Sequence, residues 1–110
     1  MDKTRCECTF EGETLTCVIL GEIDHHTAKP LREALDAQIY LYRAGTVILD
    51  LDGVGFMDSA GLGLILGRYT KVRELGGTLI LRAPSEEVCR ILHLAGVDKM
   101  IKTERKCSIK

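Results

Sequence analysis

Asp58 and Ser59 are the residues whose types and position most clearly suggest chemistry. They follow the short run Gly55-Phe56-Met57 and precede a long stretch with helical spacing. Asp58 is a good helix N-cap, because its carboxylate can accept hydrogen bonds from the free N–H groups of the first turn. Ser59 would then be the first helical residue, with its hydroxyl at the exposed mouth of a strand-to-helix turn, where open α/β sheets usually place their sites. We interpret Ser59 as a switch, a hydroxyl that a kinase can reach within a surface that docks a partner.

A catalytic serine is one alternative for the same residue. A nucleophile elbow needs the pattern G-x-S-x-G, and Met57 stands where the first glycine should be. A bulky side chain there would crowd the strained turn. His25, His26 and His93 are available as bases, but nothing in the sequence fixes any of them in that role.

A phosphotransferase is the second alternative. The run Val47-Ile48-Leu49-Asp50-Leu51-Asp52-Gly53-Val54 resembles the opening motif of haloacid-dehalogenase-type phosphotransferases. In that chemistry Asp50 would be the nucleophile, Asp52 the acid/base, and a bound magnesium would neutralise the phosphate. That family also needs a later lysine and an acidic pair on further βα units, and the sequence after Asp52 offers little room for them. The plainer interpretation is a strand end that turns polar as it reaches solvent.

Alternation, helical spacing and turn residues predict the elements that position these residues. Residues 5–10 and 14–20 alternate on either side of a turn at Gly12 and predict an antiparallel hairpin. Thr27 is a predicted cap, and Pro30 fits the first turn of a helix that closes at Gly45, a glycine suited to the left-handed position. A strand, a helix, a strand, a helix capped by Ser85 and a short edge strand follow, at residues 46–51, 59–75, 78–82, 86–95 and 100–101.

This order of elements predicts an α/β fold in a single domain. We expect a mixed, mostly parallel sheet with an N-terminal antiparallel hairpin and helices packed on it. Strand 46–51 is apolar nearly throughout, as expected of a central strand covered on both faces. The domain would span residues 1–110, with residues 102–110 as a candidate frayed tail.

The second helix carries two glycines on one side. Its spacing places Leu62, Ile65, Leu66, Tyr69 and Val72 on a face toward the sheet, and the opposite side carries Ala60, Gly63, Leu64, Gly67, Thr70, Lys71 and Glu74. Glycine in a helix interior costs about 0.8–1 kcal/mol relative to alanine, a loss that is accepted where something must approach the backbone closely. We therefore predict a docking patch for another protein on that side. The alternative is that the first helix or the N-terminal segment of the domain itself covers it.

Composition narrows the function classes. The formal net charge of −1 among 110 residues argues against a nucleic-acid or anionic-membrane role, which needs a clear basic excess. No apolar run approaches the ~20 residues that span a bilayer, and no signal peptide is visible at the N-terminus. The five cysteines, at irregular spacing without a CxxC pair, favour a reducing compartment and a role as small apolar residues: Cys6, Cys8, Cys17, Cys89 and Cys107.

Two stretches together resemble the anti-sigma factor antagonists of the STAS family, those of sporulation in particular. The first is Gly21-Glu22-Ile23-Asp24-His25-His26-Thr27-Ala28, and the second is Phe56-Met57-Asp58-Ser59-Ala60-Gly61-Leu62-Gly63 running into Ile65-Leu66-Gly67-Arg68-Tyr69. The resemblance covers the chain from the first strand through Ile101 and implies a STAS-like domain.

The resemblance also implies a regulatory binding protein rather than an enzyme. In this family the unphosphorylated form binds an anti-sigma factor that is also a serine kinase, and displaces the sigma factor. The kinase then phosphorylates the serine after the aspartate, here Ser59, which releases the antagonist, and a serine phosphatase resets it. The kinase supplies the ATP, so the domain is expected to have no cofactor of its own, no metal and a cytoplasmic location. The predicted partner-binding residues are Asp24, the family's other acidic residue beside the serine, and Asp58, Ala60, Gly61, Gly63, Leu64 and Gly67.

The sequence departs from the family pattern in two places. Ala60 stands where the sporulation protein often has a second serine, which leaves Ser59 as the expected acceptor. Residues 102–110 are shorter and more polar than the family's usual last helix, so the sequence does not predict that helix.

Overall fold

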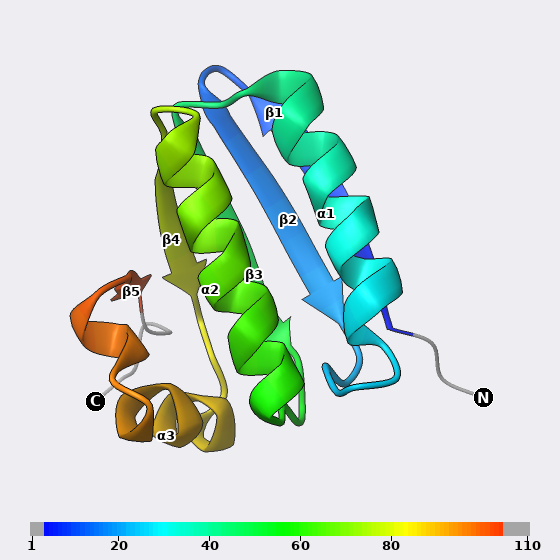
Figure 1. The fold of residues 1–110 in the computed structure, drawn as a ribbon, viewed down its shortest axis with the longest axis vertical. Helices are drawn as coiled ribbons and strands as arrows, with labels where there is room; N and C mark the ends of the chain where they lie inside the picture. Colours follow the sequence, from blue (N-terminus) through cyan, green and yellow to red (C-terminus); the bar gives the residue numbers. More distant parts are fainter. Residues whose placement is uncertain (1–3, 105–110) are drawn as a thin grey trace.

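Strands and helices alternate along the chain after an N-terminal hairpin (Figure 1). The computed structural model describes residues 4–104. Their elements are β1 (Arg5–Glu11), β2 (Thr14–Leu20), α1 (Ala28–Tyr42), β3 (Thr46–Gly53), α2 (Ser59–Glu74), β4 (Thr78–Arg82), α3 (Glu86–Leu94), a 3-10 turn (Val97–Lys99) and β5 (Lys102–Glu104).

The five strands form one sheet in the order β1-β2-β3-β4-β5. β1 and β2 are antiparallel, and they are joined by a tight turn in which Gly12 has a φ of 64°. The pairs β2–β3, β3–β4 and β4–β5 are all parallel. The predicted α/β fold, with a mixed and mostly parallel sheet in a single domain, is therefore confirmed.

Helices α1 and α2 lie side by side on one face of the sheet, and α3 lies beyond the end of β4 (Figure 1). Alternate residues of β2, β3 and β4 join the apolar residues of all three helices in one core cluster. The other face carries half-buried side chains such as Val18 and Ile80, although Ile48 between them is 7% exposed. In β3, Val47, Ile48 and Leu49 are all buried, as expected of a strand covered on both faces, although α1 and α2 lie on one face only (Figure 1).

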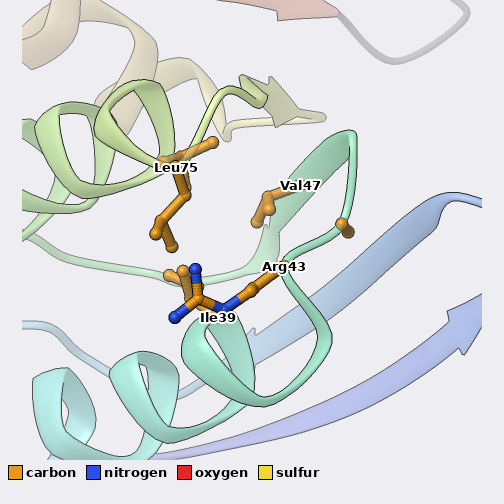
Figure 2. Close-up of a pocket in the computed structure, with 6 residues that line it drawn as sticks. Ile39, Arg43, Val47 and Leu75 are labelled. Atoms are coloured by element: carbon orange, nitrogen blue, oxygen red, sulfur yellow. The ribbon is translucent and has the colours of Figure 1, made fainter.

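Helix α1 buries Leu31, Leu35 and Ile39, which recur every four residues. It ends at Arg43, whose φ of 46° is left-handed and whose N–H donates to the carbonyl of Ile39. The sequence had favoured Gly45 for the left-handed position. Near this end Ile39, Val47 and Leu75 converge, with the Arg43 side chain beside them (Figure 2), and the space they enclose has no room for a water-sized molecule.

Helix α2 has the predicted start and nearly the predicted end, but its buried face differs. Ile65 and Val72 are buried as expected, whereas Leu62, Leu66 and Tyr69 are only half-buried. Leu64, which the helical spacing placed on the outer docking side, is 4% exposed. The reason is that α2 has two neighbours: the sheet beneath it and α1 beside it.

The C-terminal part follows the predicted pattern with a shift. Ser85 caps α3, since its hydroxyl oxygen accepts from the N–H of Val88 at 3.2 Å. The predicted edge strand at Met100-Ile101 is wrong, because these two residues form a turn and a bend after the 3-10 turn, and the strand begins at Lys102. Lys102–Glu104, the start of the predicted frayed tail, instead pair with β4. The rest of that tail, including Cys107, lies outside the described residues.

Two compositional expectations can be compared with the structure. Cys17 is buried, and Cys6, Cys8 and Cys89 are half-buried and free, with Cys6 and Cys8 packed against the core cluster. Cysteine thus serves as an apolar packing residue in β1 and β2. None of the helices in residues 4–104 has the length and apolar character needed to span a bilayer.

Candidate functional site

Backbone hydrogen bonds join the two loops that the sequence singled out. The first loop (residues 21–27) follows β2, and the second (residues 54–58) follows β3. The N–H of Ile23 donates to the carbonyl of Phe56 at 3.0 Å, and the N–H of Asp58 donates to the carbonyl of Ile23 at 3.2 Å. Ile23 and Met57 form a parallel bridge and are both buried. The two loops therefore sit side by side at the start of α1 and α2.

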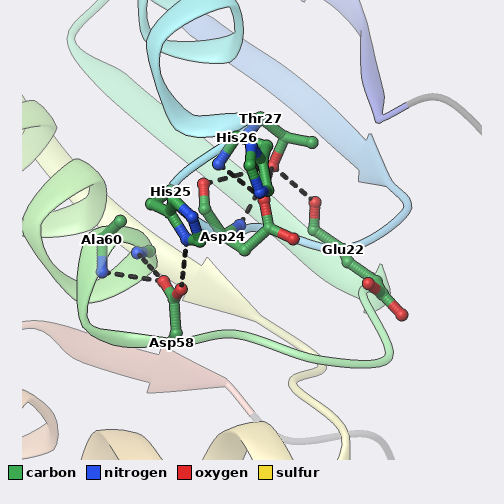
Figure 3. A network of polar contacts seen from close by, with 8 residues as sticks. Glu22, Asp24, His25, His26, Thr27, Asp58 and Ala60 are labelled. Atoms are coloured by element: carbon green, nitrogen blue, oxygen red, sulfur yellow. Dashed lines mark hydrogen bonds and ion pairs between the residues drawn. The ribbon is translucent and has the colours of Figure 1, made fainter.

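Asp58 caps α2 as predicted. Its Oδ1 accepts from the N–H of Ala60 at 2.8 Å and from the N–H of Gly61 at 3.3 Å (Figure 3). Its Oδ2 lies 3.7 Å from Nδ1 of His25, which comes from the first loop. Ser59, between the cap and these amides, is exposed at the N-terminus of the helix. A kinase can therefore reach the hydroxyl without any change in the fold.

Asp24, not Thr27, arranges the start of α1. The carboxylate oxygen Oδ1 of Asp24 accepts from the N–H of His26 at 2.9 Å and of Thr27 at 3.1 Å. Thr27 makes no side-chain cap, because its hydroxyl donates to the carbonyl of Glu22 and accepts from the N–H of Asp24 (Figure 3). Desolvation opposes ionisation of Asp24, but the hydrogen bonds from His26 and Thr27 outweigh it and hold its pKa below the usual value. Asp24 thus brings a stable negative charge to the loop beside Asp58.

A groove of about 460 Å³ runs between α1 and α2, and we call it the α1–α2 groove. It is lined by Ala28, Arg32, Ala60, Gly63, Leu64, Gly67 and Arg68. A Cβ atom built on Gly63 or Gly67 would meet no atom within 4 Å, so both glycines border open space. The groove begins one residue after Ser59. The predicted outer side of α2 is therefore partly open, as the docking hypothesis requires, and partly covered by α1.

The structure brings most of the predicted partner-binding residues together and buries two of them. Asp24 and Asp58 lie in the joined loops, and Ala60, Gly63 and Gly67 line the groove. Gly61 is buried, and a Cβ there would overlap the side chain of Met57 and lie 3.0 Å from the carbonyl of Ile23.

Gly61 is therefore a packing residue rather than a docking residue. Leu64 is 4% exposed and reaches the surface as part of the groove lining, so its docking role stays a prediction.

Sequence reasoning missed two kinds of residue at this site. Phe56, in the second loop, is 40% exposed beside Ser59, although an aromatic residue in a strand-to-helix turn is ordinarily assigned to the core. Arg68 is 4% exposed, the one buried charged side chain among residues 4–104, and Arg32 lines the groove with it. Arg32 and Asp36 lie one turn apart on α1, and Asp36 forms an ion pair with Arg68 of α2. The sequence could suggest this pair only if the two helices were already known to be neighbours.

Asp50 and Asp52 lie at the end of β3 in the positions that the phosphotransferase hypothesis needs. The carboxylate of Asp50 accepts from the backbone N–H of Asp52 at 3.0 Å, a local turn-like contact. In the part of the chain that the structure describes, no three or more His, Cys, Asp or Glu side chains are grouped so that they could hold a metal ion. The arrangement adds no support to this alternative.

The comparison with protein families identifies the family of this chain. The STAS domain model matches residues 7–108. This chain belongs to the STAS domain family. The STAS domain is 35% identical over 85 residues to the anti-sigma F factor antagonist of Lysinibacillus sphaericus, with 77% of this chain and 73% of the relative covered. It is 36% identical over 89 residues to the anti-sigma-B factor antagonist of Bacillus subtilis (strain 168), with 80% and 79% covered.

Solved structures of the anti-sigma factor antagonist SpoIIAA are similar in both of its states. The unphosphorylated form gives a TM-score of 0.64 at 25% identity, covering 86% of this chain and 96% of that one. The phosphorylated form from Bacillus gives a TM-score of 0.69 at 26% identity, covering 92% of both chains. The fold of this STAS domain thus resembles both states.

Proposed function

We propose that this STAS domain is an anti-sigma factor antagonist that phosphorylation of Ser59 switches off. In its unphosphorylated form it binds an anti-sigma factor that is also a serine kinase, and so frees the sigma factor. The observation that carries the proposal is the exposed hydroxyl of Ser59 at the N-terminus of α2, one residue before an open groove. The relatives named as antagonists of anti-sigma F and anti-sigma-B factors support this class of partner.

A phosphate on Ser59 is compatible with the free domain. Phosphoserine carries about −1.5 to −2 charges at neutral pH. At a helix N-terminus the dipole stabilises such a charge by about 0.3–1 kcal/mol. Ser59 is exposed, so the phosphate stays in water and the fold has no reason to change.

The same phosphate opposes docking. In a complex the dianion must leave water, which costs several kcal/mol unless cations match it. Asp24 and Asp58 are the neighbouring carboxylates, and both add like-charge repulsion. A net penalty of about 3–4 kcal/mol would weaken binding several-hundred-fold. Phosphorylation therefore acts as an electrostatic release of the partner rather than as a conformational switch.

The remaining components follow from this cycle. The partner kinase supplies the ATP, so the domain needs neither a cofactor nor a metal of its own, and it is not itself an enzyme. A serine phosphatase restores the hydroxyl. The partners are proteins, with no direct contact to nucleic acid or membrane, and the cycle takes place in the cytoplasm.

Phosphate mapping tests the proposal directly. The purified chain is incubated with ATP and an anti-sigma factor kinase from the same organism, and the modified residue is located by mass spectrometry. We expect one phosphate, on Ser59, and release of the complex as it accumulates. Ser59→Ala should bind the kinase and stay bound. Normal phosphate incorporation into Ser59→Ala would show that the acceptor lies elsewhere.

A further inference from the structure

The inner end of the α1–α2 groove holds a guanidinium that is short of partners. Arg68, on α2, is 4% exposed, and its Nη1 is buried without a hydrogen-bond partner. Its Nε lies 2.9 Å from Oδ1 of Asp36 on α1, but the geometry is that of an ion pair and not of a hydrogen bond, since both atoms also lack a hydrogen-bond partner. A buried donor left unpaired costs about 1–3 kcal/mol. Asp36 thus balances the charge of Arg68 without using its donors.

The groove carries an excess of positive charge. Arg32 lines it one helical turn before Asp36, and it is close enough to Arg68 that its charge lowers the pKa of that guanidinium, after the larger effect of burial. Lys71, one turn after Arg68, lies with its Nζ 5.5 Å from the centre of the Tyr40 ring, on the same α1–α2 seam. Asp36 and Glu74 are the carboxylates whose charges act on Arg68 and Lys71 along this seam, where Arg32, Arg68 and Lys71 are the cations.

The shape of the groove admits a side chain from a folded partner. Gly63 and Gly67 leave the backbone of α2 uncovered, and Ala28 and Ala60, which also line the groove, have small side chains. A partner can therefore bring its own backbone close to α2 and direct a side chain along the floor toward Arg68. A guanidinium presents a planar fork of donors that matches a carboxylate with two hydrogen bonds.

We propose that the α1–α2 groove is a receptor for one acidic side chain of the anti-sigma factor, an Asp or Glu whose carboxylate pairs with Arg68 at the floor and with Arg32 at the rim. The inference rests on the proposed function and names the chemistry of its contact. The carboxylate satisfies the unpaired donor of Arg68 and offsets the excess positive charge. Binding through this groove thus needs an unhindered α2 backbone as well as an uncharged Ser59. Gly63 and Gly67 leave that backbone accessible, and Arg32 and Arg68 supply the positive charge.

Arg68→Lys is the central variant, because lysine keeps the charge beside Asp36 and removes the forked donors. We expect binding to the purified anti-sigma factor, measured by isothermal titration calorimetry, to weaken at least about tenfold. Arg32→Gln, at the rim, should weaken it about two- to fivefold and reduce its salt dependence. Arg90→Lys on the exposed side of α3 is the matched control and should bind as the wild type does.

Four outcomes decide the inference. The first supports it: replacing one Asp or Glu of the partner by Ala weakens binding as much as Arg68→Lys does, and the two changes together weaken it no further. Should Arg68→Lys fail to fold, Arg32→Glu takes its place, and rescue of its binding by an Asp→Arg or Glu→Arg change in the partner supports the inference. Wild-type affinity in folded Arg68→Lys overturns the inference and leaves the proposed function intact. A wild-type chain that does not bind the anti-sigma factor at all overturns both.

Discussion

Replacing Gly63 and Gly67 by alanine should make the free domain more stable and its complex weaker. Both residues lie in the interior of α2, where glycine costs about 0.8–1 kcal/mol relative to alanine. A Cβ at either position meets no atom within 4 Å, so no new clash offsets the gain. The free energy of unfolding should therefore rise by about 0.8–1 kcal/mol for each substitution, and by about 2 kcal/mol for the pair.

The effect on docking has the opposite sign. If a partner packs against the exposed backbone of α2, each added methyl group crowds the interface, and overpacking typically costs about 1–3 kcal/mol. This corresponds to binding that is roughly 5- to 150-fold weaker. Gly63→Trp should extend the trend by abolishing binding while leaving the melting temperature nearly unchanged, since the ring would stand in open space.

Urea-induced unfolding and calorimetric titration with the anti-sigma factor measure the two effects separately. Gly61→Ala is the matched control on the same helix, and its methyl group would overlap Met57 and destabilise the domain by about 1–3 kcal/mol. The reasoning fails in one of two ways. A less stable Gly63→Ala would mean that this face is packed within the fold. A more stable Gly63→Ala with unchanged affinity would mean that no partner approaches there.

Substitutions at three further positions test the loops and the C-terminal turn. Ser59→Asp should keep the circular dichroism spectrum and lose binding to the anti-sigma factor, and retained binding would contradict the electrostatic argument. Asp24→Ala should lower the melting temperature, because the N–H groups of the first loop lose their acceptor, while Asp24→Asn, which keeps an acceptor oxygen, should lower it less; equal losses would assign the effect to charge. The hydrogen bond from His93, at 2.9 Å, holds the pKa of Asp98 below its usual value, so its contribution to stability is present at pH 7 and is lost as the pH falls through that lowered value. Asp98→Asn should therefore melt earlier than the wild type at pH 7, and the difference should vanish once the pH has fallen well below the lowered pKa of Asp98; a difference that persists in acid would refute the assignment.

The sequence predicted the structure correctly where a residue type has one common role in local structure, such as capping a helix. Asp58 before a helical pattern predicted a cap, and its carboxylate takes the two expected N–H groups. Ser85 predicted the start of α3 in the same way. The alternation in β1 and β2 and the apolar run of β3 predicted the sheet. The exposure of Ser59 followed from its place after the cap, since the first turn of a helix at the end of a strand points to solvent.

The errors have a common cause in contacts between elements distant in the sequence. The spacing of α2 gave a face toward the sheet, but it could not show that α1 lies alongside and buries Leu64 and Arg68. Thr27 looked like a cap, yet the first loop folds back so that Asp24 supplies the acceptor and Thr27 ties the loop to Glu22. The strand predicted at Met100-Ile101 formed two residues later because pairing with β4 fixes its register.

The two loops are held together by main-chain hydrogen bonds, whereas their exposed side chains are available to contact a partner. Ile23 and Asp58 make these bonds through their amides, so the loops keep their places whatever side chains stand on their outer surface. Exposed positions such as Glu22 and Phe56 can then be exchanged without loss of these main-chain bonds. Duplicated copies of such a domain could diverge at these positions alone, so that each copy binds a different anti-sigma factor in the same cell.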